Sequence, residues 1–198
     1  MINLINVSKT ISGNNILSNI NLEFKEGECV WLRGHNGCGK TMLLRMLCGL
    51  IRPSEGEVTC DQEYRYGVII ESPSFFPFET AMYNLKYLAA INKLVTENTI
   101  LEYLETLNLT SVKNKKVRTF SLGMKQRLAI CQAFMENPDV VLLDEPFNAV
   151  DDDNLKVICN LINDFKNEGK IIVIASHGDI PIGCSIDRTI QMSAGKIV

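Results

Sequence analysis

Residues 29–48 read CVWLRGHNGCGKTMLLRMLC, and this pattern sets the fold class. Residues 29–32 are all apolar, as in a strand that is covered on both faces of a sheet. A glycine-rich loop follows, and residues 42–48 are apolar almost all round, which predicts a buried helix. Gly49 and Pro53 mark the end of that helix. A buried strand, a glycine loop and a buried helix in succession indicate a parallel α/β sheet.

Two further apolar runs, 140–143 and 171–175, fit the same kind of sheet. By contrast, Ile20, Leu22 and Phe24 alternate with polar residues, which predicts a half-exposed, antiparallel and peripheral strand. Helical patterns occupy the middle of the chain, around 81–91, around 99–107 and from about 122 to 136. We predict one domain over residues 1–198, in which residues 1–70 and 136–198 form an α/β core with a β subdomain and residues 71–135 form a helical insert.

The glycine-rich loop matches the pattern GxxxxGK[ST]. Its backbone N–H groups and the N-terminus of the following helix suit a phosphate group, while the lysine reaches the β- and γ-phosphates and the threonine hydroxyl binds Mg²⁺. The pattern arises by chance in roughly 1 chain in 100, but here it lies between a buried strand and a buried helix. We therefore predict a P-loop NTPase core that binds ATP through Gly34, His35, Asn36, Gly37, Cys38, Gly39, Lys40 and Thr41. This loop alone also fits a kinase or a GTPase.

Polar residues follow the other two apolar runs directly. Asp144 and Glu145 come after residues 140–143, and His177 comes after residues 171–175. Ligands of open α/β sheets bind beyond the carboxyl ends of the strands. We expect Asp144 to hold Mg²⁺, Glu145 to orient and deprotonate the attacking water, and His177 to contact the γ-phosphate. The alternatives are two solvated loop acids and a structural histidine.

Composition narrows the class of protein. The formal net charge is −3, which gives no reason to expect nucleic acid. Seven cysteines occur without a CxxC pair, which excludes that kind of metal site and favours reduced thiols in a cytosolic compartment. No apolar run approaches the roughly 18 residues of a membrane-spanning helix, and residues 1–6 are not a secretory signal.

Residues 119–127, TFSLGMKQR, resemble the LSGGQ-x-QR signature of ABC-type ATPases. Ser121, Gly123, Gln126 and Arg127 match, whereas Phe120, Leu122 and Met124 depart from the commonest form. Ser121 also reads simply as a helix N-cap. The motifs follow the order of the family, with residues 148–151 similar to its D-loop, and the resemblance covers essentially the whole chain.

This resemblance implies a composite site. In the family two subunits pack head to tail, so that Ser121, Leu122, Gly123 and Met124 of one subunit face the phosphate loop of the other, with Asp151 in the D-loop. It further implies a homodimer, or a dimer with a related ATPase, on the cytoplasmic face of transmembrane permease subunits. The sequence is similar to ATPases of bacterial exporters of the bacitracin and lantibiotic type. A non-transport ABC ATPase and a nucleotide sensor without turnover are the alternatives.

Three positions depart from the family or invite a second interpretation. Glu71 stands where a glutamine is expected, and we predict that it remains a ligand of Mg²⁺ or water. Ile11 lies where an aromatic residue usually stacks on adenine, which predicts a weaker platform. Cys38 is either a small residue that fits the loop or a thiolate favoured by the helix N-terminus.

The stretch after Glu71 is rich in aromatic residues. It includes Phe75, Phe76 and Phe78, followed by Met82 and Tyr83. These side chains fit either a local core of the helical insert or, by the resemblance, a groove for a helix of the membrane subunit.

Overall fold

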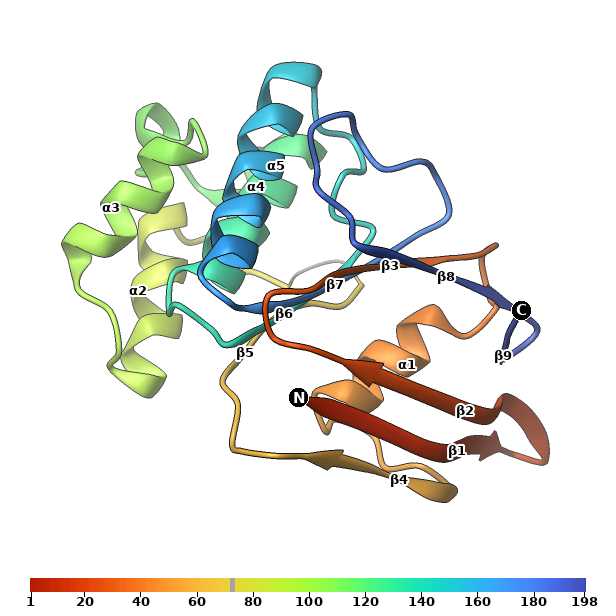
Figure 1. Ribbon diagram of the computed structural model, residues 1–198. Coiled ribbons are helices and arrows are strands. Elements are labelled where there is room, and N and C mark those ends of the chain that lie inside the picture. The colour runs from red at the N-terminus through yellow and green to blue at the C-terminus, as the bar shows by residue number, and fades with distance from the viewer. Residues whose placement is uncertain (72–73) are drawn as a thin grey trace.

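The computed structural model describes residues 1–71 and 74–198 and contains two sheets (Figure 1). The larger sheet has the strand order β5-β6-β7-β3-β8-β9. Its first five strands run parallel, and β9 is antiparallel to β8. The bounds are β3 Cys29–Arg33, β5 Tyr66–Ile69, β6 Val140–Asp144, β7 Ile171–Ser176, β8 Arg188–Ser193 and β9 Lys196–Ile197. The three apolar runs are therefore the neighbouring strands β6, β7 and β3, as predicted for covered parallel strands.

The smaller sheet is antiparallel and peripheral, which confirms the prediction for residues 20–24. It consists of β1 (Ile2–Ile11), β2 (Asn14–Phe24) and β4 (Glu55–Cys60), in the order β2-β1-β4. Along β2, Ile20 and Phe24 are fully buried while the polar residues between them are more exposed. The alternation places one face of this sheet on the core.

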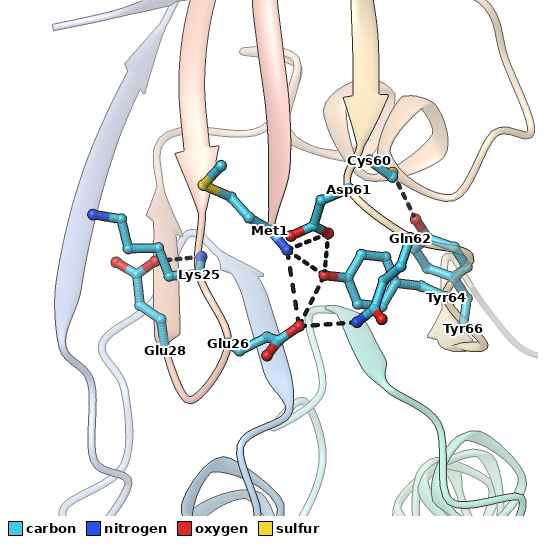
Figure 2. Close-up of polar contacts among 9 residues, drawn as sticks. All are labelled: Met1, Lys25, Glu26, Glu28, Cys60, Asp61, Gln62, Tyr64 and Tyr66. Carbon is cyan, nitrogen blue, oxygen red and sulfur yellow. Dashed lines mark hydrogen bonds and ion pairs between the residues drawn. The ribbon is translucent and has the colours of Figure 1, made fainter.

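Polar contacts link Met1, just before β1, to the connection between β4 and β5 and to the connection between β2 and β3 (Figure 2). The ammonium group of Met1 donates to Asp61 Oδ1 at 2.7 Å and also contacts the Tyr64 hydroxyl. That hydroxyl donates to Asp61 and lies 3.1 Å from Glu26, which precedes β3. Hydrogen bonds from the ammonium and from Tyr64 lower the pKa of Asp61. This cluster links the start of the antiparallel sheet to the residues that lead into β3 of the larger sheet.

Helix α1 (Lys40–Leu47) lies between the two sheets, while α4 (Leu122–Phe134) and α5 (Asp152–Asn167) cover the opposite face of the larger sheet (Figure 1). Helices α2 (Ala81–Asn92) and α3 (Glu97–Thr106) pack outside α4, and two short 3₁₀ turns, Thr110–Val112 and Val117–Thr119, lead back to it. Helices α2 to α4 lie within residues 71–135, where the helical insert is predicted.

The larger sheet separates two hydrophobic clusters. In β6, Val140 and Leu142 pack towards α1, whereas Val141 and Leu143 pack towards α4 and α5. All four residues are fully buried, which explains why this strand is an uninterrupted apolar run. Within residues 1–71 and 74–198, no helix has the length and hydropathy to cross a membrane.

Candidate nucleotide-hydrolysis site

The loop between β3 and α1 has the backbone of an anion cradle. Gly37 and Gly39 have φ angles of 79° and 110°, in the left-handed region that favours glycine. A Cβ on Gly34 would lie 2.4 Å from the Met192 carbonyl oxygen, so a side chain there would displace backbone. Lys40 is only 6% exposed, and its Nζ donates to Gly34 O at 2.6 Å. The lysine therefore closes the loop on itself with its charge directed inward.

A cavity of about 330 Å³ opens beside this loop. It brings the loop together with Asp144, the last residue of β6, and with Glu145, which follows it, although these acids lie more than 100 positions from the loop in the chain. Its lining consists of Ile16, Asn36, Gly37, Gly39, Lys40, Thr41, Met42, Arg45, Glu71, Asp144 and Glu145. Most of the residues predicted for nucleotide and metal binding thus surround one space.

Thr41 and Asp144 meet in this cavity. The Thr41 hydroxyl donates to Asp144 Oδ2 at 2.6 Å. Burial raises the pKa of Asp144, with the hydrogen bond from Thr41 opposing that shift and the charge of Glu145 adding to it. A hydroxyl and a carboxylate side by side are hard oxygen donors, the chemistry that Mg²⁺ prefers. This donor set fits the predicted metal.

Glu145 and His177 form a second pair at the same edge of the sheet. Glu145 Oε1 accepts from the backbone N–H of His177 at 3.0 Å and lies 2.7 Å from its Nδ1. A carboxylate only accepts, so Nδ1 carries the proton and Nε2 of a neutral His177 is an acceptor. Glu145 has a φ of 49°, a strained backbone for this residue type and one that occurs at functional sites.

Glu71 lies at the mouth of the cavity with a partner that sequence reasoning missed. Arg45 Nη2 donates to Glu71 Oε1 at 2.5 Å. Arg45 stands four residues after Thr41 on α1, so the two side chains lie on the same face of the helix. This spacing is the feature of the sequence that could have pointed to Arg45 as a residue of the site. Glu71 also borders a neighbouring cavity of about 310 Å³, which is lined by Glu71, Leu122, Gln126, Asp144, Glu145 and Asn148.

The N-terminus of α4 carries the signature motif. The Ser121 hydroxyl accepts from the N–H of Met124 at 3.2 Å, so Ser121 is the N-cap, and the Leu122 side chain beside it is exposed. A Cβ on Gly123 would lie 2.4 Å from the Ala149 carbonyl oxygen. Gly123 thus lets the signature helix touch the stretch that resembles the D-loop.

Asp151 begins α5 as its N-cap. Its carboxylate accepts from the backbone N–H of Asn154 at 3.0 Å, and this hydrogen bond is the main cause of its lowered pKa. Nearby, Arg127 donates from Nη1 to the carbonyl oxygens of Leu107 and Asn108, at 2.7 and 3.0 Å. The segment that follows α3 is therefore hydrogen-bonded to the signature helix.

The structure bears on the interpretation of two side chains, Ile11 and Cys38. Ile11 does not line the cavity at the phosphate loop, whereas Ile16 does. Ile11 is 41% exposed at the end of β1, so the adenine platform at Ile11 stays a prediction and Ile16 is the better-placed apolar residue. Cys38 is 1% exposed, within the cluster that includes α1. That burial favours the interpretation of Cys38 as a small residue that fits.

The aromatic stretch divides between core and surface. Phe75 and Met82 pack against the core of the helical region. Phe76, Tyr83 and Tyr87 are about half exposed, and the ring centroids of Phe76 and Tyr87 lie 5.1 Å apart, edge to face. We refer to Phe76, Tyr83 and Tyr87 as the aromatic patch.

A glycine loop on a helix N-terminus, two acids at the end of a buried strand and a histidine after the neighbouring strand define a nucleoside triphosphatase of the P-loop class. The family model described as ABC transporter matches residues 17–148, more than half of the chain. The chain belongs to the ABC transporter family, as an ATP-binding subunit that hydrolyses ATP.

Relatives and solved structures agree with this assignment. The chain is 39% identical over 206 residues to the ABC transporter ATP-binding protein YybJ of Bacillus subtilis, covering 100% of this chain and 94% of that protein. It is 34% identical to the bacitracin transport ATP-binding protein BcrA of Bacillus licheniformis, over 97% of this chain and 66% of that protein. For the lantibiotic transport ATP-binding protein SrtF of Streptococcus pyogenes, the identity is 33% and the shares are 89% and 80%.

Among solved structures, the ATP-binding cassette MJ0796 in a dimeric post-hydrolysis state with ADP and Pi matches with a TM-score of 0.91. The sequence identity is 28%, and the match covers 100% of this chain and 96% of that one. A second dimeric structure of the same cassette gives a TM-score of 0.89. The α/β core with its antiparallel β subdomain is therefore an ABC cassette fold.

Proposed function

We propose that this chain powers the export of a compound by a separate transmembrane permease, to which it binds on the inner face of the cell membrane. The relatives named for bacitracin and lantibiotic transport support a role in transport, and the resemblance of the sequence to exporters of that type favours the outward direction. The signature form at residues 121–127 and the glutamate at position 71 support the same group.

The site residues have distinct roles in this proposal. Lys40 and the loop N–H groups bind the β- and γ-phosphates, and Thr41 and Asp144 hold Mg²⁺, with Glu71 as a further ligand. The metal supplies charge neutralisation on the phosphates. Glu145 orients the attacking water and accepts its proton, a contribution of roughly 10²–10⁴ in rate.

His177 positions Glu145 in the resting site through its Nδ1 proton. A hydrogen bond from Nε2 to the γ-phosphate requires a proton on Nε2, which the tautomer with the proton on Nδ1 does not carry. The proposed γ-phosphate contact therefore requires the proton arrangement on His177 to differ from that of the resting site. It is supported by the place of His177 at the carboxyl end of β7, beside β6 and Glu145.

Two subunits complete the site. We place Ser121, Leu122, Gly123 and Met124 of one subunit against the γ-phosphate held by the other, with Asp151 at the junction. Exposure of Leu122 at the N-terminus of α4 supports this arrangement, because such helix ends bind anions. Both solved structures of the related cassette MJ0796 are dimers.

The membrane partner docks on the aromatic patch in this proposal. Exposed aromatic side chains are enriched in the centres of protein interfaces. Phe78, two residues after Phe76, is 67% exposed, and the Arg118 guanidinium lies 5.6 Å from the centroid of its ring. An amphipathic helix of the permease is the expected occupant.

One observation supports the hydrolysis mechanism above all, namely that the Thr41–Asp144 and Glu145–His177 pairs share one edge of the sheet. The test is light scattering of purified Glu145→Gln with and without Mg-ATP. Slowed hydrolysis should hold ATP in the composite site, so ATP should convert the monomer to a dimer. Lys40→Ala in the same background is the control, because weakened phosphate binding should abolish the shift. A Glu145→Gln protein that binds ATP and stays monomeric would contradict closure of a homodimer.

A further inference from the structure

The ion pair between Arg45 and Glu71 joins the phosphate-loop helix to the end of β5. Arg45 is one turn beyond Thr41 on α1, and its guanidinium contacts Glu71, which lines the same cavity. The side chains are 31% and 63% exposed, so the pair is accessible to solvent and to an incoming ion. The fold itself does not depend strongly on such a pair.

Charges around the cavity explain why a partner for Glu71 matters. The described lining contains three carboxylates, Glu71, Asp144 and Glu145, and two cations. The Lys40 ammonium is engaged by the carbonyl oxygens of the loop. Arg45 is the cation that directly contacts one of these carboxylates. It offsets the negative charge that a glutamate adds at a position where nucleotide phosphates approach.

The geometry also leaves part of Glu71 available. Arg45 contacts Oε1, and among the described contacts Oε2 has no hydrogen bond. A carboxylate held by one oxygen can bind a cation through the other, and such outer partners typically change metal affinity by about 10–100-fold. The backbone of Glu71 has a φ of 63°, in the left-handed region that is uncommon for a residue with a side chain.

We propose that Arg45 is a positioning residue that holds Glu71 Oε1 so that Oε2 can bind the Mg²⁺ of the nucleotide. This inference rests on the proposed function, in which Thr41, Asp144 and Glu71 form the metal site. It assigns to α1 two tasks one turn apart: Thr41 contacts the metal, and Arg45 orients the carboxylate opposite.

The test measures binding and not turnover. Affinity for a fluorescent ATP analogue is determined by anisotropy as a function of free Mg²⁺ and in EDTA, for wild type, Arg45→Gln, Glu71→Gln and the double variant. We expect Arg45→Gln to reduce the Mg²⁺-dependent gain in affinity by about 10–100-fold and to leave the affinity in EDTA unchanged. In the Glu71→Gln background the same change should have little effect. Arg52→Gln is the matched control, because Arg52 follows α1 outside the cavity lining.

Other outcomes overturn the inference in separate ways. An equal loss in EDTA and in Mg²⁺ would make Arg45 a direct phosphate ligand. A full loss that persists in Glu71→Gln would show that Arg45 does not act through Glu71. Failure of the proposed function is different: the wild type itself would then show no gain with Mg²⁺, and Asp144→Asn would change nothing.

Discussion

Substitution of Gly123 by alanine tests how closely the signature helix must approach the D-loop stretch. The added Cβ would lie 2.4 Å from the Ala149 carbonyl oxygen, whereas ordinary contacts begin at 3.4 Å. The two segments must therefore separate by about 1 Å, the difference between these distances. The obstacle is backbone, so no side-chain rotation relieves it.

The expected magnitudes separate stability from activity. Overpacking of this kind costs about 1–3 kcal/mol, and replacing a helical glycine by alanine returns about 1 kcal/mol. The net loss of up to about 2 kcal/mol lowers Tm by several degrees in a chain of this size. A displacement of about 1 Å at a catalytic constellation costs about 10²-fold in rate. We expect Gly123→Ala to fold and bind ATP, because the loop at residues 34–41 is untouched, but to hydrolyse it about 100-fold more slowly.

The assay is phosphate release at saturating Mg-ATP, together with thermal unfolding and nucleotide binding. Gly178→Ala is the control for adding a methyl group, because a Cβ there meets no atom within 4 Å. Turnover within twofold of wild type, with Tm unchanged, would refute the argument. It would mean that the contact between Gly123 and Ala149 does not fix the position of the signature helix.

Further predictions concern single groups. Asp144→Asn should raise the Tm of the nucleotide-free protein at pH 7.5 by a few degrees, the usual gain from relieving a destabilised active site. Burial raises the pKa of Asp144, so its charge, which destabilises the folded state, appears as the pH rises. The difference in Tm between the variant and the wild type should therefore vanish at acidic pH, where the carboxyl is protonated. A difference in Tm that does not depend on pH would contradict this cause. Ala149→Gly should stabilise by up to about 1 kcal/mol, because Ala149 has a φ of 60°, and a lower Tm would disprove it. Thiol titration of the native protein should find one fast cysteine, Cys60, which Cys60→Ser removes, since Cys29, Cys38, Cys131 and Cys159 are buried. Of the two partly buried thiols, burial raises the pKa of Cys48, and, against an opposing hydrogen bond with Cys159, a hydrogen bond with Cys29 together with burial raises the pKa of Cys184, so both should react slowly. A fast thiol in the Cys60→Ser protein would contradict this prediction.

Local patterns in the chain were sufficient for strands β3, β6 and β7, for helices α1 to α4 and for the phosphate loop. The apolar runs are strands, the helix after Lys40 is buried, and Ser121 caps α4, because hydrophobic periodicity and capping depend on near neighbours. The motif at residues 34–41 likewise predicts the conformation of its loop, because that conformation depends on residues within the motif. The family resemblance added the order of the motifs along the chain.

Pairings between distant segments arise instead from strand order and packing. Strand β7 lies between β6 and β3, although it comes last of the three in the chain, and this order sets Glu145 beside His177. The contacts of Arg45 with Glu71 and of Gly123 with Ala149 likewise join segments 26 residues apart. Such contacts depend on how helices cover a sheet, for which the periodicity of either segment carries no information. Ile16 lines the cavity and Ile11 does not, a difference that depends on how β1 and β2 pack beside the phosphate loop.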